Sequence, residues 1–153
     1  MLFRDRPLHE WMSFHASRPA TIVLHQDEHL HVELLPGLCA LVNTWSGFLQ
    51  GPAYRERMDR CVEVLRIAAA HTILANVQAL RPLLAEDQVW TNENWAPRAA
   101  AAGLKRMGVV LPTTVFAQLA VTRIVRKLDQ IAIHTAEFGE LPDAMRWLES
   151  LYR

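Results

Sequence analysis

The feature that most constrains the fold of this chain is a change in hydrophobic spacing along residues 21–152. Apolar and polar residues first alternate with the two-residue period of half-buried β-strands, and a nearly all-apolar run over 38–44 follows. From residue 52 onward, helix-length amphipathic segments alternate with short apolar runs. This order, β-β-β-α-β-α-β-α-β-α, predicts a single α/β domain. We expect a mixed, largely parallel sheet of about six strands with about four helices and an antiparallel meander at its start.

Element boundaries follow from the same spacing and from turn and capping residues. Strands are expected at 22–24, 30–34, 38–44, 72–77, 107–111 and 131–138, and helices at 52–70, 86–102, 114–128 and 142–152. Pro36-Gly37 suits a type II turn with glycine at positive φ, and Pro97 predicts a bend in the second helix because proline has no N–H. The third helix is expected to turn five apolar residues inward: Val115, Phe116, Leu119, Ile124 and Leu128.

Chain length fits one domain, because 153 residues can bury about two thirds of the unfolded surface. We expect an N-terminal extension at 1–18, followed by the domain at 19–153. Within the extension, Leu8, Trp11 and Met12 have the spacing of one amphipathic turn, and a loosely held terminus is the alternative.

The balanced net charge argues against nucleic acid and anionic membranes as partners. Because 16 Lys and Arg residues balance 16 Asp and Glu residues, the chain has no overall field to attract nucleic acid or an anionic membrane. A local basic group remains, and its members are Arg123, Arg126, Lys127, Lys105 and Arg106. A solvated face is the favoured interpretation, with an acidic partner surface or a lipid headgroup as the alternative.

Targeting features and cysteine usage point to one compartment. No run of 18 apolar residues occurs, and the N-terminus lacks the continuous apolar stretch of a signal peptide. Cys39 and Cys61 lie in apolar or amphipathic segments without metal-binding spacing, so both are expected to be reduced core residues. The expected location is cytoplasmic.

Three segments carry a resemblance to a known family. "LVNTWSGFL" ends the third strand, "EDQVWTNENWAPR" forms a helix with paired tryptophans, and "EFGELPDAMRWLESL" closes the chain. Together they resemble the SpoIIAA-like branch of the STAS domains, the small α/β fold of bacterial anti-sigma-factor antagonists, which is also similar to the CRAL-TRIO lipid-transfer domains. The resemblance spans roughly residues 20 to 152.

The resemblance implies a regulatory turn that this chain lacks. Phosphoregulated STAS domains carry an Asp-Ser-Ser-Gly-like turn after the central strand, where a kinase partner modifies serine, and the added charge would disrupt an apolar partner surface. The matching segment here is Asn76-Val77-Gln78-Ala79-Leu80, and no serine or threonine occurs between Thr72 and Thr91. The sequence therefore predicts a non-catalytic interaction module without the phosphoswitch.

The strand-end edge is the expected binding face, because open α/β sheets bind ligands at the carboxyl ends of their strands. Its candidate residues are Asn43, Trp45, Phe48, Gln78, Leu80 and Trp90. The tryptophans of the second helix, Trp90 and Trp95, are five residues apart, so one is expected in the core and the other at a cleft or partner. The partner is expected to be another protein, a second copy of the chain, or a small apolar or lipid-like ligand in a pocket of several hundred cubic ångströms.

Two catalytic or metal-binding alternatives remain open. A small enzyme would combine a carboxylate of Glu86, Asp87 or Glu93 with a histidine of the first hairpin. A metal site would use the histidines around Asp27, namely His25, His29 and His31. The favoured interpretation of both groups is structural, and no phosphate-cradling glycine loop or nucleophile elbow occurs, so no catalytic residue and no cofactor are expected.

Overall fold

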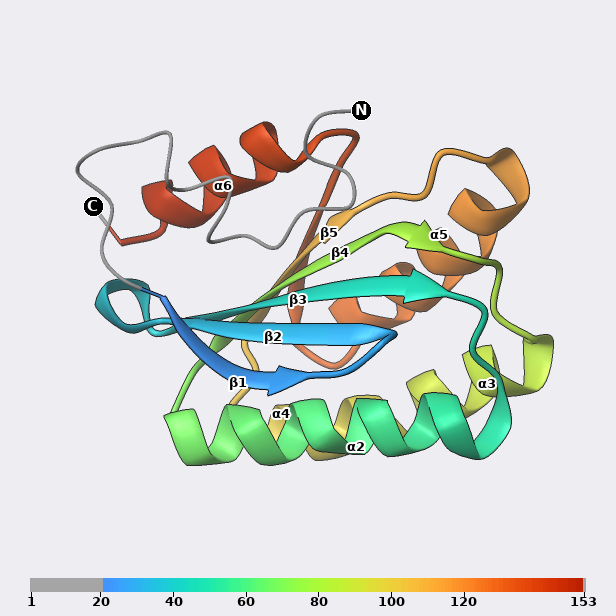
Figure 1. The fold of residues 1–153 in the computed structure, drawn as a ribbon, viewed down its shortest axis with the longest axis horizontal. Helices are drawn as coiled ribbons and strands as arrows, with labels where there is room; N and C mark the ends of the chain where they lie inside the picture. Colours follow the sequence, from blue (N-terminus) through green and yellow to red (C-terminus); the bar gives the residue numbers. More distant parts are fainter. Residues whose placement is uncertain (1–20, 153) are drawn as a thin grey trace.

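A six-stranded sheet forms the centre of the computed structural model, which describes residues 21–152 (Figure 1). Its strands are β1 (Ile22–Gln26), β2 (Leu30–Leu35), β3 (Ala40–Gly47), β4 (Thr72–Leu80), β5 (Arg106–Val110) and β6 (His134–Phe138). They lie in the sheet in chain order; the β1–β2 and β2–β3 pairs are antiparallel and the remaining pairs are parallel. The predicted mixed sheet with an antiparallel start is confirmed.

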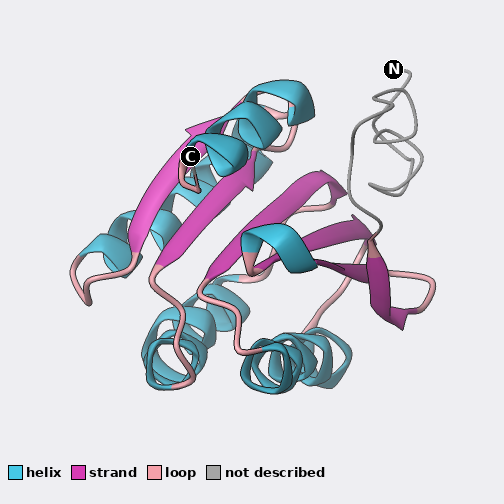
Figure 2. Cartoon of the chain, turned by 90° about the vertical axis from the view of Figure 1, so that its left-hand side faces the viewer, coloured by secondary structure: helices cyan, strands magenta, loops and turns pink. Residues whose placement is uncertain are grey.

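Four helices cover the two faces of this sheet (Figure 2). They are α2 (Gly51–Ala68), the continuous helix made of α3 (Ala85–Trp90), η2 (Thr91–Trp95) and α4 (Ala96–Ala101), then α5 (Val115–Asp129) and α6 (Leu141–Ser150). The first three pack on one face over the larger core, and α6 packs alone on the other face. No helix within residues 21–152 is both long and apolar enough to cross a membrane. The predicted extension at 1–18, with Leu8, Trp11 and Met12, lies outside the described residues.

The turn before β3 differs from the prediction. Pro36–Leu38 forms a 3-10 turn, and positive φ (48°) falls on Cys39 instead of Gly37. Cys39 is exposed at the end of this turn, and β3 starts at Ala40, two residues later than predicted. The prediction that Cys39 is a core residue was wrong, whereas Cys61 is buried as expected.

Strand β4 is longer than its apolar run predicts. It continues three residues beyond Val77 because Gly47 at the end of β3 pairs with Leu80 after a register shift between Thr44 and Ser46. The segment that the sequence presents as a turn is therefore strand up to Leu80. In contrast, β6 is shorter and starts at His134 instead of residue 131.

Helix α5 presents a different stripe to the sheet from the one expected. Thr114 caps it by accepting a hydrogen bond from the backbone N–H of Ala117. Val115, Phe116 and Leu119 are exposed by 69, 82 and 48%, so the prediction that they face inward was wrong. The buried stripe is Ala117, Ala120, Ile124, Val125 and Leu128. Alanine at two of these positions lets the first turns of the helix approach the sheet closely.

Candidate functional site

The carboxyl ends of β3, β4 and β5 meet at one edge of the sheet, which we call the strand-end edge. The edge is held together by backbone pairing, since the N–H of Arg81 donates to the carbonyl oxygen of Gly47 at 2.9 Å. The chain segments that leave these strands lead directly into α2, α3 and α5 (Figure 1). Residues from three separate parts of the sequence therefore share this edge, whereas the predicted binding face used only the ends of the third and fourth strands.

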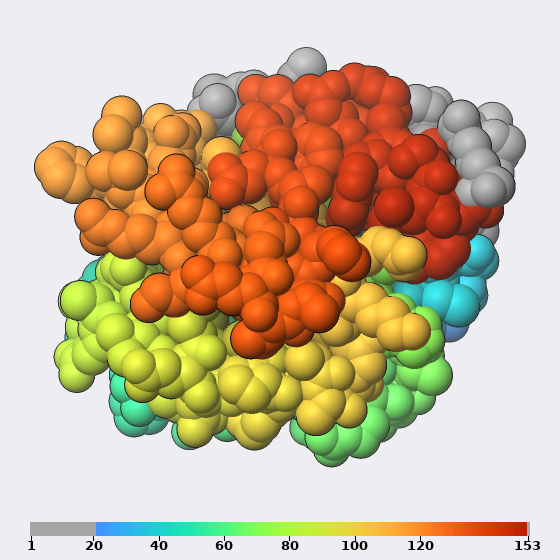
Figure 3. Space-filling model, turned by 180° about the vertical axis from the view of Figure 1, so that it is seen from behind, coloured from blue at the N-terminus to red at the C-terminus, as the bar shows by residue number. Residues whose placement is uncertain are grey.

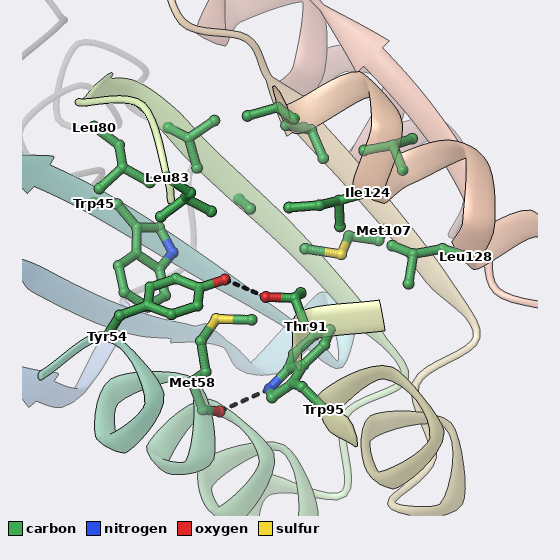
Figure 4. A pocket seen from close by; sticks show the side chains of 15 residues that line it. Trp45, Tyr54, Met58, Leu80, Leu83, Thr91, Trp95, Met107, Ile124 and Leu128 are labelled. Carbon is green, nitrogen blue, oxygen red and sulfur yellow. Dashed lines mark hydrogen bonds between the residues drawn. The ribbon is translucent and has the colours of Figure 1, made fainter. Parts of the chain in front are cut away.

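An apolar cavity of about 70 Å³ lies behind this edge, between the sheet and the three helices of the larger core (Figure 4). Trp45, Leu80 and Leu83 line it from the strand-end side. Its other walls are formed by Tyr54, Met58, Ala75, Val77, Thr91, Trp95, Met107, Val109, Val121, Ile124, Val125 and Leu128. A cavity that accommodates benzene is about 150 Å³ and ligand pockets are several hundred, so a lipid-like ligand would require these helices to move apart.

The few polar groups of the cavity wall are already hydrogen-bonded to one another. The hydroxyl of Thr91 donates to the carbonyl oxygen of Asp87 at 2.7 Å, so the hydroxyl of Tyr54 donates to Thr91 Oγ1, also at 2.7 Å. Trp95 Nε1 donates to the carbonyl oxygen of Met58 at 2.8 Å. Burial raises the pKa of Tyr54 well above its ordinary value. Among the described residues, those that line the cavity are neutral, and none of them is a carboxylate, histidine, lysine, arginine, serine or cysteine.

A π-helical segment, η2, forms part of this wall. The backbone N–H of Ala96 donates to the carbonyl oxygen of Thr91, five residues earlier, and both Thr91 and Trp95 are buried there. The irregularity that the sequence predicts near Pro97 therefore lies in the turn before this proline. Its effect is to place the Thr91 hydroxyl and the Trp95 indole on the same core-facing side.

The predicted binding residues separate into different environments. Trp45 and Leu80 line the cavity, and Phe48 is exposed by 48%. Asn43 is buried and donates through Nδ2 to Cys61 Sγ, and Gln78 is buried on the opposite face of the sheet, where it donates through Nε2 to the carbonyl oxygen of Gly139. These two amides therefore hold the core together and are not available at the edge.

Of the paired tryptophans, one lies in the core as expected, and the other is not found at a cleft. Trp95 is buried in the core, whereas Trp90 is half-buried and packs edge-on against Tyr54. The guanidinium groups of Arg55 and Arg98 lie 5.2 and 5.8 Å from the centre of the Trp90 ring, within the range of cation–π attraction. The Trp90 side chain therefore packs on the outer side of α3 and η2 and does not line the cavity.

The carboxylates proposed for acid–base chemistry do not converge on a histidine. Glu86 and Glu93 are exposed, whereas Asp87 is fully buried. The Asp87 carboxylate accepts hydrogen bonds from the backbone N–H of Gly51 at 2.9 Å and from Arg55 Nε at 3.3 Å. Its partners make it a structural group that joins α3 to α2.

The hairpin histidines are each held by a different partner. His25 Nε2 lies 2.6 Å from Asp27 Oδ2, His31 Nε2 lies 2.7 Å from Glu33 Oε1, and His29 Nδ1 donates to the carbonyl oxygen of Ser46. Among residues 21–152, no group of three or more His, Cys, Asp or Glu side chains is arranged to hold a metal ion. The histidine group considered as a metal site is therefore not assembled in the described part of the chain.

Exposed apolar side chains follow the carboxyl ends of three adjacent strands, and sequence reasoning found only one of them. Phe48 follows β3, Leu84 follows β4, and Val115 and Phe116 follow β5. Their exposed fractions range from 37% for Leu84 to 82% for Phe116. We call these four residues the edge strip. The missed signal is the run Val115–Val121, which is apolar on two sides of the helix, so only one side can be buried.

The same arrangement of sheet and helices occurs in solved structures. The anti-sigma factor antagonist SpoIIAA in its unphosphorylated form matches with a TM-score of 0.51 over 86% of this chain and 97% of that chain, at 11% sequence identity. The chain has a SpoIIAA-like, or STAS-like, fold. An uncharacterized protein of SpoIIAA-like fold from Shewanella loihica PV-4 matches with a TM-score of 0.51 at 16% identity, over 84% of this chain and 92% of that chain.

No protein-family model and no curated protein matches the chain. At these identities the SpoIIAA-like likeness establishes the fold alone. The function of this chain therefore has to be inferred from the chemistry of its own surface.

Proposed function

We propose that this protein is a non-catalytic regulatory interaction module that binds a protein partner through its strand-end edge. The observation that carries the proposal is the edge strip, in which Phe48, Leu84, Val115 and Phe116 are exposed in the segments that follow the adjacent strands β3, β4 and β5. Large apolar side chains that cluster on a surface favour a protein interface, because burying them removes apolar area from water.

The SpoIIAA-like fold supports a regulatory role, since one protein of this fold is an anti-sigma factor antagonist. We infer that the partner of this chain is not controlled by phosphorylation at the end of β4. The segment after Thr72 contains no hydroxyl side chain before Thr91, and Gln78, Leu80 and Leu83 are buried. A phosphate could therefore be neither attached nor accommodated in this segment.

Affinity purification from the protein's own host tests the proposal. The bait proteins are the native chain, Phe116→Asp, and Ile67→Asp as the matched control, because Ile67 is 74% exposed on α2. We expect a specific partner with the native chain and with Ile67→Asp, and its loss with Phe116→Asp. Retention of the partner by Phe116→Asp and by the corresponding Phe48→Asp variant would refute binding through the edge.

A second copy of the chain is one candidate partner. Burial of the edge strip in a homodimer would make the molar mass depend on concentration, and Phe116→Asp would abolish this dependence. Light scattering coupled to size-exclusion chromatography measures both. A single monomer peak across a wide concentration range would exclude the homodimer and leave a different protein as the partner.

A further inference from the structure

A second concave surface lies beside the edge strip, between α3–η2 and α5. It is a groove of about 430 Å³ lined by Ala85, Gln88, Val89, Asn92, Arg123, Arg126, Lys127 and Gln130. The helices are joined beneath it, since Asn92 Nδ2 donates to the carbonyl oxygen of Ile124 at 3.0 Å. Figure 3 shows this face of the molecule, with α3 in yellow-green and α5 in orange.

The groove is strongly positive although the chain as a whole is neutral. Arg123, Arg126 and Lys127 are all exposed, and none of their side chains forms an ion pair or hydrogen bond with another described residue. No acidic side chain of residues 21–152 lines the groove. The only acid of α5, Asp129, instead accepts hydrogen bonds from the backbone and the hydroxyl of Thr135. Three neighbouring cations thus face one groove without a counter-charge.

The exposed stripe of α5 changes character along its length. Phe116 and Leu119 occupy its first turns, and Arg123, Arg126 and Lys127 follow at spacings of three and four residues, which keeps them on one side of the helix. Across the groove, Val89 is 49% exposed on α3. The surface is therefore apolar next to the edge strip and basic farther from it.

We propose that this groove binds an acidic amphipathic segment of the partner protein. The segment places its apolar side chains on Val89, Phe116 and Leu119 and its carboxylates on Arg123, Arg126 and Lys127. The proposal rests on the function proposed above, because it names the kind of partner that the same face recognises. Charge complementarity and continuity with the edge strip both select such a segment.

Other occupants fit the same surface less well. A small anion would leave most of its surface in water, because the three cations stand exposed at an open groove. It would also leave Phe116 and Leu119 uncovered. A flat bilayer surface would not enter a groove between two helices. A peptide segment covers the basic and the apolar parts together.

Fluorescence anisotropy with a synthetic probe tests the proposal. The probe is a fluorescein-labelled helical peptide with leucines in its first two turns and glutamates in its last two, and a second peptide carries lysines in place of the glutamates. We expect the full-length protein to bind the acidic probe at least tenfold more tightly than the basic one. Binding should weaken at least tenfold in Arg123→Glu/Lys127→Glu and should fall with added salt.

Matched variants distinguish binding in the groove from a general effect of the protein's charge. Arg66→Glu makes the same kind of charge change at an exposed position of α2 and should leave binding unchanged. Arg123→Gln/Lys127→Gln should weaken binding by an intermediate factor, and circular dichroism confirms that each variant is folded. Equal loss in Arg66→Glu, or full competition by inorganic triphosphate, would overturn the proposal in favour of unspecific anion binding.

Two further results would also overturn it. In the first, the native chain does not bind the probe but binds vesicles of phosphatidylcholine and phosphatidylserine, and the Arg123→Glu/Lys127→Glu variant does not bind these vesicles. This result would indicate that the groove binds a lipid surface. The other concerns the partner purified through the edge strip. If that partner is lost with Phe116→Asp and unaffected by Arg123→Glu/Lys127→Glu, the proposed function stands and the acidic-segment inference fails.

Discussion

The carboxylate of Asp87 accepts a hydrogen bond from the backbone N–H of Gly51 at 2.9 Å, across 36 positions of sequence. Gly51 is the first residue of α2, and the residue before it, Gln50, makes no side-chain cap. Asp87 therefore caps the start of α2 from a different helix. It also lies 3.3 Å from Arg55 Nε in the first turns of the same helix. Both oxygens of this carboxylate therefore have partners on α2 and hold α3 against it.

Removal of this cap should lower the free energy of unfolding. Asp87→Ala leaves the Gly51 N–H and the Arg55 guanidinium without their acceptor, and we expect a loss of about 1–3 kcal/mol. Urea denaturation measures it. The control is Glu86→Ala, an exposed neighbour, which should change stability by less than about 0.5 kcal/mol. Similar losses in both variants would contradict the cap.

Gly108 should be indispensable for the packing of α6. A Cβ atom at this position would lie 2.6 Å from Cζ3 of Trp147 and 3.1 Å from Cδ1 of Leu74. Gly108→Ala should therefore displace the indole and cost about 1–3 kcal/mol, as overpacking does. Thermal denaturation and Trp fluorescence report both effects. Gly139→Ala, whose Cβ would meet nothing within 4 Å, is the control and should be nearly neutral.

Alkaline pH should destabilise the protein in two stages. Burial raises the pKa of the Cys61 thiol from 9.0 to about 12, so its stabilising effect is complete below pH 9 and is lost as pH rises toward 12. The unfolding free energy should fall there by about 1.4 kcal/mol per pH unit for this group. Burial also raises the pKa of Tyr54 above 10.0, which adds a second decline at higher pH.

Variants at Cys61 and Tyr54 show which side chain causes each stage of the decline in unfolding free energy. Cys61→Ala should be less stable at neutral pH, but its unfolding free energy should decline less steeply above pH 9. Tyr54→Phe should retain the first stage and lose the second. Urea denaturation under reducing conditions across this pH range makes the measurement. An unchanged slope in Cys61→Ala would show that the thiol does not control alkaline stability.

Asp27 should contribute stability at neutral pH that disappears in acid. Burial alone would raise its pKa, but hydrogen bonds from the backbone of His29 and Leu30 and from the side chains of His25 and Arg57 outweigh burial and hold the pKa well below 3.8. A lowered pKa stabilises the folded state above the ordinary value, and this contribution is lost as pH falls below it.

Asp27→Asn should therefore cost about 1–2 kcal/mol at pH 7, because the hairpin also loses its ion pair with Arg57 on α2. The difference from the native chain should shrink between pH 5 and pH 2. Glu28→Gln is the control, since its side chain is 81% exposed, and it should show neither effect. A constant difference at all pH values would mean that the charge of Asp27 does not stabilise the hairpin.

Strand and helix order could be predicted because hydrophobic spacing is a local property of the sequence. The antiparallel start and the buried run of β4 appear in the structure as expected. The alternation along β2 does not become alternating burial, because His31 and Glu33 are buried as well. The length of β4 and the position of the positive φ at Cys39 were not predictable in this way. Both depend on which residues a neighbouring strand offers for pairing, as the Gly47–Leu80 register shows.

The sequence by itself determined the mixed α/β sheet with an antiparallel start, and the absence of a hydroxyl side chain between Thr72 and Thr91. Only the tertiary structure decided which side of α5 is buried, because its first turns carry apolar residues on two sides and packing selects Ala117 and Ala120. That selection leaves Phe116 and Leu119 in solvent and aligns them with Arg123, Arg126 and Lys127 beside the edge strip. A surface of this kind depends on contacts between distant segments, and local spacing does not encode those contacts.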